Sequence, residues 1–198
     1  SMGSFLLRQY LTMYGNGLSG AIIMATGYKG PAILAAGKML CRGIAAFHGW
    51  RYRSKLVNNL GMGSFNKKFE PSKSKKEWVT SDEEIRSAYE RDPLCNFIFT
   101  VNGYYQMFTG MQTLNVQENM NRIPKDLPVF FVAGTDDPVG DFGKGVKRVY
   151  QKYKQSGMQD VKIKLYQGAR HEILNERKRE TVYKDLYDWM ESKRGLIQ

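Results

Sequence analysis

The sequence predicts an α/β protein with a mostly parallel sheet flanked by helices. Three apolar runs have the length and the β-branched or aromatic content of buried strands: residues 18–25, 129–133 and 161–165. Apolar residues with helical spacing follow the first residues of the chain, at 5–14, and return near its end, at 180–193. Between residues 30 and 117 the strand–helix alternation stops and the pattern becomes mainly helical.

This change of pattern predicts how the chain is organised. Residues 1–29 and 118–198 are expected to form the core of the fold, and residues 30–117 an inserted helical lid. No internal repeat is visible in the sequence. The core is therefore expected to be discontinuous in sequence, with the lid inserted after one of its strands.

Helical patterns and loops alternate within the insertion. Ser81 and Glu84 have the spacing of a capping box, so a helix is expected to begin there with Ser81 as its cap. The other segments are two helical stretches at 31–46 and 54–60, a Gly-, Ser- and Lys-rich loop at 61–76, and an aromatic- and Met-rich stretch at 102–114. The aromatic and Met side chains of the insertion could line a pocket for an acyl chain or could simply form its core.

Composition is that of an ordinary globular protein. Hydrophobic residues make up 42% of the 198 residues and charged residues 25%. No apolar run approaches the ~20 residues of a membrane-spanning helix. Cys41 and Cys95 lie far apart and have no metal-ligand spacing, so the sequence predicts a reduced, cytoplasmic setting and neither a metal nor a cofactor.

Positive charge is concentrated in the first part of the insertion. From Lys29 to Lys76 there are 11 Lys and Arg residues and one acid, Glu70, in a chain whose net charge is +11. Such an excess can attract phospholipid headgroups, so a peripheral membrane contact is one interpretation and a solvated loop the other. Nucleic acid is not an expected partner, because no recognised binding motif accompanies this charge.

The first residues of the chain have the pattern of a catalytic turn. Ser1-Met2-Gly3-Ser4 matches the second half of a G-x-S-x-G nucleophile elbow, in which a sharp strand-to-helix turn exposes a serine hydroxyl. On this interpretation Ser1 is the nucleophile and the Met2 N–H contributes to an oxyanion hole. The other interpretation is a Ser-Met remnant of tag removal.

Candidates for a catalytic acid and a catalytic base follow the second and third predicted strands. Asp137 stands after the strand at 129–133, immediately before Pro138, and Asp136 is the alternative to it. His171 stands in a loop after the strand at 161–165. An Asp-Pro turn and a solvated histidine are the ordinary interpretations of these residues, but the order Ser, Asp, His is that of the α/β-hydrolase triad.

The three residue types fit one reaction. A serine hydroxyl becomes a good nucleophile only when an imidazole takes its proton. The imidazole in turn needs a carboxylate on its other nitrogen, which fixes its tautomer and stabilises its protonated form. Ser1, His171 and Asp137 could therefore carry out acyl transfer without a cofactor.

Three segments resemble the lysophospholipase and monoacylglycerol-lipase branch of the serine hydrolases, which is catalogued with the serine aminopeptidase domain: SMGSF at 1–5, GTDDPVG at 134–140 and GARHE at 168–172. The resemblance implies an α/β-hydrolase fold with Ser1 as nucleophile, Asp137 as acid and His171 as base. It also implies a strand and a Gly-His pair directly before Ser1, and about five strands in all before it.

The expected function is hydrolysis of carboxylic esters, first of all monoacylglycerol- or lysophospholipid-like lipids. Three alternatives remain open at this point. The protein could be an aminopeptidase of the same fold, an N-terminal-nucleophile hydrolase in which the α-amine of Ser1 is the base, or a non-catalytic fragment or binding protein on a hydrolase scaffold.

The resemblance also predicts that residues 1–198 are the latter part of a longer hydrolase. The N-terminal strands of the sheet and the second oxyanion donor would then come from polypeptide that precedes Ser1, in the same or another chain. Without those neighbours the strands would expose backbone groups and apolar faces, so we expect that residues 1–198 do not fold alone.

Overall fold

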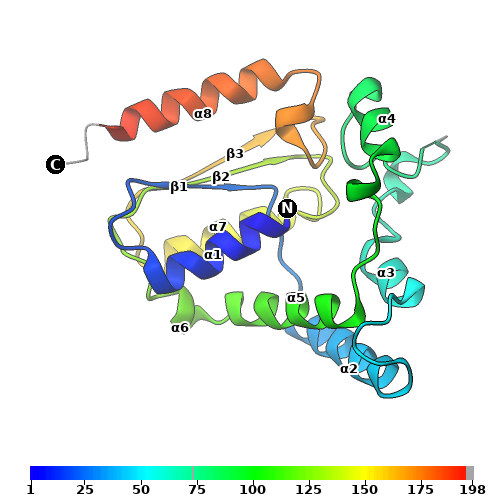
Figure 1. The fold of residues 1–198 in the computed structure, drawn as a ribbon. Coiled ribbons are helices and arrows are strands. Elements are labelled where there is room, and N and C mark those ends of the chain that lie inside the picture. The colour runs from blue at the N-terminus through cyan, green and yellow to red at the C-terminus, as the bar shows by residue number, and fades with distance from the viewer. Residues whose placement is uncertain (73, 195–198) are drawn as a thin grey trace.

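The computed structural model describes residues 1–72 and 74–194, and its centre is a parallel sheet (Figure 1). The strands are β1 (Ala21–Met24), β2 (Val129–Gly134) and β3 (Val161–Tyr166), in the order β1-β2-β3. Val129 in the middle strand lies opposite Ala21 on one side and Val161 on the other. All three strands therefore end at the same edge of the sheet, where α/β proteins carry their functional groups.

Helices cover both faces of this sheet. α8 (Arg179–Arg194) lies on one face, and α1 (Met2–Tyr14) and α7 (Lys144–Gln155) lie on the other (Figure 1). A strand between two helical layers should be apolar along its whole length, and every residue of β2 is buried. The predicted α/β class, with a parallel sheet flanked by helices, is confirmed.

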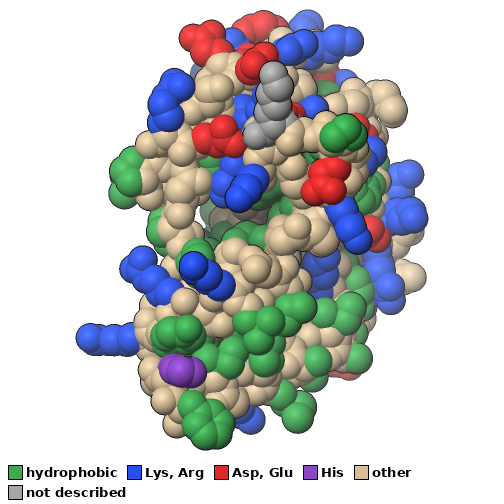
Figure 2. Space-filling model, turned by 90° about the vertical axis from the view of Figure 1, so that its right-hand side faces the viewer, with side chains coloured by type: hydrophobic (Ala, Val, Ile, Leu, Met, Phe, Trp, Pro, Cys, Tyr) green, Lys and Arg blue, Asp and Glu red, His purple; other side chains and the backbone are tan. Residues whose placement is uncertain are grey.

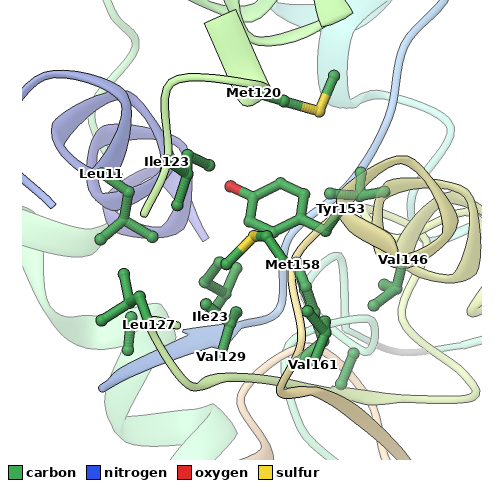
Figure 3. Close-up of a cluster of buried hydrophobic side chains, with 14 residues drawn as sticks. Leu11, Ile23, Met120, Ile123, Leu127, Val129, Val146, Tyr153, Met158 and Val161 are labelled. Carbon is green, nitrogen blue, oxygen red and sulfur yellow. The ribbon is translucent and has the colours of Figure 1, made fainter. Parts of the chain in front are cut away.

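The side chains of β2 divide between two buried clusters. Val129 and Phe131 pack with Leu11 of α1 and Tyr153 of α7, and this cluster is the larger one (Figure 3). The side chains in between pack on the opposite face against α8, where the rings of Phe130 and Trp189 stack. This alternation follows from the two-residue period of a strand. It fixes the register of the sheet, because a shift by one residue would exchange the two faces.

The structure describes five helices between β1 and β2. They are α2 (Pro31–His48), α3 (Lys55–Met62), α4 (Glu83–Arg91), α5 (Val101–Leu114) and α6 (Gln117–Met120). Short 3₁₀ turns lie at Lys67–Phe69 and Pro93–Cys95 in the same segment, and at Ile173–Asn175 after β3. α2 and α5 pack along each other around a buried cluster of their own, which includes Cys41 and Tyr104. α5 also contacts α1, so this helical segment rests on the core of the sheet.

Two sequence-based expectations were wrong in detail. The strand predicted at 18–25 is shorter, because the chain turns at Gly17 with a positive φ and leaves Leu18 partly exposed. The cap of α4 is Asp82 and not Ser81: the Asp82 carboxylate accepts the N–H groups of Glu84 and Ile85 in the first turn. The Ser81 hydroxyl instead donates to the buried carboxylate of Glu176.

Candidate active site

Ser1 stands at the beginning of α1, beside the ends of the strands (Figure 1). Its α-amine donates a hydrogen bond of 3.1 Å to the carbonyl oxygen of Met24, the last residue of β1. Although Ser1 occupies the N-cap position, its side chain makes no capping hydrogen bond, so the hydroxyl is not used to hold the helix. Met2 is the first helical residue, and its N–H is one of those that a helix leaves without an internal acceptor.

Asp137 lies in the loop after β2 and is completely buried. Its Oδ1 atom accepts hydrogen bonds from the Val139 backbone N–H and from Nδ1 of His171, each at 2.9 Å. The neighbouring Asp136 points elsewhere, and its Oδ1 pairs with Lys68 Nζ at 2.7 Å near the surface. Of the two acids considered from sequence, Asp137 is therefore the one that contacts the histidine.

His171 lies in the loop after β3, and only 4% of it is exposed. The hydrogen bond to Asp137 makes Nδ1 the protonated nitrogen of the neutral ring, which leaves Nε2 as an acceptor. The Trp78 ring, from the segment between β1 and β2, lies 5.2 Å from the imidazole between ring centroids. The Trp78 carbonyl oxygen accepts the His171 backbone N–H at 3.2 Å.

Gly134 allows the loops of Asp137 and His171 to lie against each other. A Cβ atom at Gly134 would stand 2.0 Å from the carbonyl oxygen of Ala169 and 2.4 Å from that of Arg170. No side chain fits in that space, because both obstacles are backbone atoms. A glycine at the end of β2 therefore lets the two loops approach and brings their functional side chains into contact.

Ser1 and His171 line a common cavity of 370 Å³ beside β1, together with Met24 and Ala25. Among the hydrogen bonds of residues 1–72 and 74–194, none joins Ser1 Oγ to His171. The structure thus brings Asp137 into contact with His171, and places Ser1 and His171 on the wall of one cavity. The roles predicted for Ser1, Met2, Asp137 and His171 stay predictions.

A larger cavity of 820 Å³ lies between Ser1 and the helical segment, and Met2 also lines it. Its lining combines two kinds of side chain. The polar members include Asn58, Asn59, Asn66, Glu70, Lys75, Lys76, Asn96 and Glu172, and the apolar ones include Met62, Trp78, Leu94, Phe97, Ile98 and Phe99. A cavity with both kinds of wall suits a ligand that has a polar end and an apolar end.

A cluster of charged side chains around Arg170, the residue before His171, was not predicted from the sequence. Arg170 Nη1 lies 2.6 Å from Glu77 Oε2, and Arg86 Nη1 lies 3.0 Å from the same oxygen. Burial raises the pKa of the Glu77 carboxyl, but hydrogen bonds from Arg170 and Ser72 and the two guanidinium charges together bring this pKa below its ordinary value. The only signal in the sequence was the position of Arg170 directly before His171, and nothing there pointed to Glu77.

In residues 1–72 and 74–194, no group of three or more His, Cys, Asp and Glu side chains is arranged to hold a metal ion. None of the helices described is both long and apolar enough to cross a membrane.

A known protein family covers most of this chain. Residues 1–178 match the family model described as serine aminopeptidase, S33. The chain belongs to this family. The family predicted from the SMGSF, GTDDPVG and GARHE segments is therefore confirmed.

Named relatives include a lipase and an esterase. A monoglyceride lipase of Saccharomyces cerevisiae is 30% identical over 122 residues, which are 57% of this chain and 37% of that protein. The structure of a thermostable carboxyl esterase from Bacillus coagulans in complex with glycerol is similar, with a TM-score of 0.85 and 29% identity over 96% of this chain and 62% of the other. The structure of a monoglyceride lipase variant from S. cerevisiae has a TM-score of 0.71 and 22% identity over 98% of this chain and 63% of the other, and it supports the fold alone.

These comparisons confirm the α/β-hydrolase fold. The chain spans about a third of the curated relative and under two thirds of the solved structures that it resembles. The expectation that polypeptide before Ser1 supplies further strands and a second oxyanion donor stays a prediction, and so does a cytoplasmic location.

Proposed function

We propose that this protein is a serine hydrolase that cleaves carboxylic esters, with monoacylglycerol- or lysophospholipid-like lipids as its first substrates. The observation that carries the proposal is the buried pair of Asp137 and His171, which stands beside a cavity that Ser1 also lines. The family and the named relatives, a monoglyceride lipase and a carboxyl esterase, support the same reaction class.

The reaction follows from the roles assigned to these residues. His171 Nε2 takes the proton of Ser1 Oγ as the oxygen attacks the ester carbonyl, and Asp137 Oδ1 stabilises the imidazolium through the Nδ1 proton. The Met2 N–H, at the positive end of α1, donates to the oxyanion of the tetrahedral intermediate. His171 then gives the proton to the leaving alcohol, and water releases the acyl group from Ser1 by the same steps.

The larger cavity favours an amphipathic ester as substrate. Its apolar wall, which includes Phe97 and Phe99, fits an acyl chain, and the amides of Asn58 and Asn59 fit hydroxyl groups of a glycerol headgroup. We assign residues 30–117 the role of a lid, because these residues supply most of the wall opposite Ser1. On this proposal the core carries the chemistry and the lid selects the substrate.

The aminopeptidase alternative has one observation in its favour. Glu70 and Glu172 line the larger cavity and could pair with the α-amine of a peptide. Lys75 and Lys76 line the same cavity, so the two carboxylates are matched by two ammonium groups. An amine would meet no net negative charge there, and for this reason we favour the ester.

Labelling with a fluorophosphonate tests the proposal, in the longest natural chain that contains residues 1–198. We expect labelling at Ser1 and hydrolysis of glycerol monoesters in preference to aminoacyl anilides. Ser1→Ala should abolish both, whereas Ser4→Ala, one turn along the same helix, should remain labelled. His171→Ala should remove nearly all labelling; labelling that persists would overturn the role of His171 as the base.

We also propose that the lid contacts anionic membranes. Figure 2 shows apolar side chains gathered on the lower part of the lid face, with Lys and Arg side chains around them. Five apolar residues of α2 and α3 are mostly exposed: Ile33, Met39, Phe47, Leu56 and Leu60. Apolar area next to positive charge is the combination that binds lipid surfaces.

Vesicle flotation tests this contact. The protein should float with vesicles of phosphatidylcholine mixed with phosphatidylserine, and much less with phosphatidylcholine alone. Phe47→Ser, at the most exposed of these positions, should reduce flotation. Tyr187→Ser on α8 serves as the control, since Tyr187 is an exposed aromatic residue outside the lid. Equal flotation of the two variants would contradict the proposal.

A further inference from the structure

The residue directly before each of the two paired side chains forms an ion pair with the segment between β1 and β2. Asp136, before Asp137, pairs with Lys68 at 2.7 Å, and Arg170, before His171, pairs with Glu77 at 2.6 Å. The first pair is largely solvated, with 45% of the Lys68 side chain and 29% of the Asp136 side chain exposed. The second is mostly buried, with 15% of the Glu77 side chain and 18% of the Arg170 side chain exposed.

Residues 77–81, here called the strap, hold the His171 loop through its backbone. The His171 N–H donates to the Trp78 carbonyl at 3.2 Å, and the Glu172 N–H donates to the Val79 carbonyl at 2.8 Å. On the other side, the Thr80 hydroxyl donates to the Asn175 carbonyl at 2.7 Å. These contacts join positions that lie more than 90 residues apart in the sequence.

The Arg170 side chain also binds the strap to the histidine loop. Its Nη1 atom donates to the carboxylate of Glu77 and to two strap carbonyls, those of Glu77 at 2.5 Å and Thr80 at 3.1 Å. The guanidinium also lies over the Phe69 ring, 4.4 Å from its centroid. Glu77 is the anion between this guanidinium and that of Arg86. If its charge were removed, two cations would face each other with little solvent to screen them.

We infer that Glu77 is a positioning residue for His171, which keeps the strap closed on the histidine loop so that the imidazole faces Ser1. The inference rests on the proposed role of His171 as the base. Over the described residues, the linings of the two cavities include Trp78 but not Glu77. Glu77 should therefore influence turnover through the geometry of His171 and leave substrate binding nearly unchanged.

The test compares Glu77→Gln with Lys68→Met, in the longest natural chain that contains residues 1–198. Glu77→Gln should lower kcat and the rate of fluorophosphonate labelling by about tenfold to a hundredfold, because small errors of placement cost that much. Its KM should change by less than about twofold, and Lys68→Met should alter both constants by no more than that, because the Lys68 pair is exposed. Glu77→Asp, which keeps the charge, should recover part of the lost turnover.

Amide hydrogen exchange gives a readout that does not depend on ester hydrolysis. The amides of His171 and Glu172 should exchange faster in Glu77→Gln than in the parent, since both donate to the strap. If the parent hydrolyses no ester, the proposed function fails while the exchange still tests the strap. Faster exchange with unchanged kcat would overturn the positioning role, and so would a raised KM with unchanged kcat.

A second variant covers the case in which Glu77→Gln does not fold. Arg170→Lys keeps the positive charge but lacks the planar guanidinium that lies over the Phe69 ring and contacts three strap oxygens. It should lower kcat with little change in KM. An unchanged kcat in folded Arg170→Lys would overturn the inference.

Discussion

The loops of Asp137 and His171 differ in which part of the molecule positions them. Apart from the bond to His171, the hydrogen bonds of Asp137 itself lie within its own loop: Oδ1 accepts the Val139 N–H, and the carbonyl accepts the Phe142 N–H at 2.8 Å. The His171 loop depends on residues far away in sequence, above all Trp78 and Val79 of the strap. Asp137 is therefore positioned by the loop after β2, whereas His171 is also held by the segment between β1 and β2.

This difference suggests how substrate binding could be linked to catalysis. Trp78 lines the larger cavity and also accepts the His171 N–H through its carbonyl. A ligand that moves the strap would move His171 but leave Asp137 in place. Substitutions in the Asp137 loop should thus act on chemistry directly, and substitutions in the strap should act through the orientation of the histidine.

The largest expected effect is the loss of turnover on substitution of Asp137. Asp137→Asn should lower turnover by up to ~10⁴-fold, because an amide cannot fix the tautomer of His171 or stabilise its protonated form. Asp136→Asn is the matched control and should change turnover by only about twofold, because its partner Lys68 is exposed. Steady-state kinetics on a glycerol monoester measures both. A large loss in Asp136→Asn instead would exchange the roles of the two acids.

The contact between the two loops should be the next most sensitive point. A Cβ at Gly134 would overlap the backbone of Ala169 and Arg170, so Gly134→Ala must push the loops apart. We expect a loss of about 3 kcal/mol in the free energy of unfolding, the upper part of the range for overpacking, because backbone atoms cannot turn aside. Thermal or urea unfolding measures it.

Gly43 in α2 provides the control for that substitution. A Cβ there meets no atom within 4 Å, so Gly43→Ala should stabilise the protein by about 0.5–1 kcal/mol through helix propensity. If Gly134→Ala proved as stable as Gly43→Ala, the two loops would not be in firm contact. The contact of Asp137 with His171 would then not depend on Gly134.

Local patterns in the sequence predicted the core well. The apolar run at 129–133 predicted β2, and the position of Asp137 before Pro138 distinguished it from Asp136 as the acid that contacts His171. These features depend on neighbouring residues and on the period of a strand. They are therefore visible without knowledge of the three-dimensional arrangement.

The strap could not be predicted in the same way. Glu77 is separated from Arg170 by 93 residues, and no pattern near either residue indicates the other. The spacing of Ser81 and Glu84 predicted a capping box, but the Ser81 hydroxyl donates to the carboxylate of Glu176, which lies 95 residues further along the chain. In both places a long-range contact decided the outcome over a local preference.

The smallest expected effect concerns the charge of Glu77 and its dependence on pH. The pKa of Glu77 in the folded protein lies below its ordinary value, so the ionised form stabilises the fold. This contribution is complete above the ordinary pKa of a glutamate and is lost as the pH falls through the lowered pKa of the folded state. The melting temperature of Glu77→Gln should therefore lie below that of the parent near neutral pH and approach it in acid.

Thermal unfolding of both proteins between about pH 7 and pH 3 measures this gap in melting temperature. Lys68→Met should show little gap from the parent at any pH, because its ion pair is solvated. A gap of the same size at both ends of the range would mean that the shape of Glu77, and not its charge, holds Arg170 and the histidine loop.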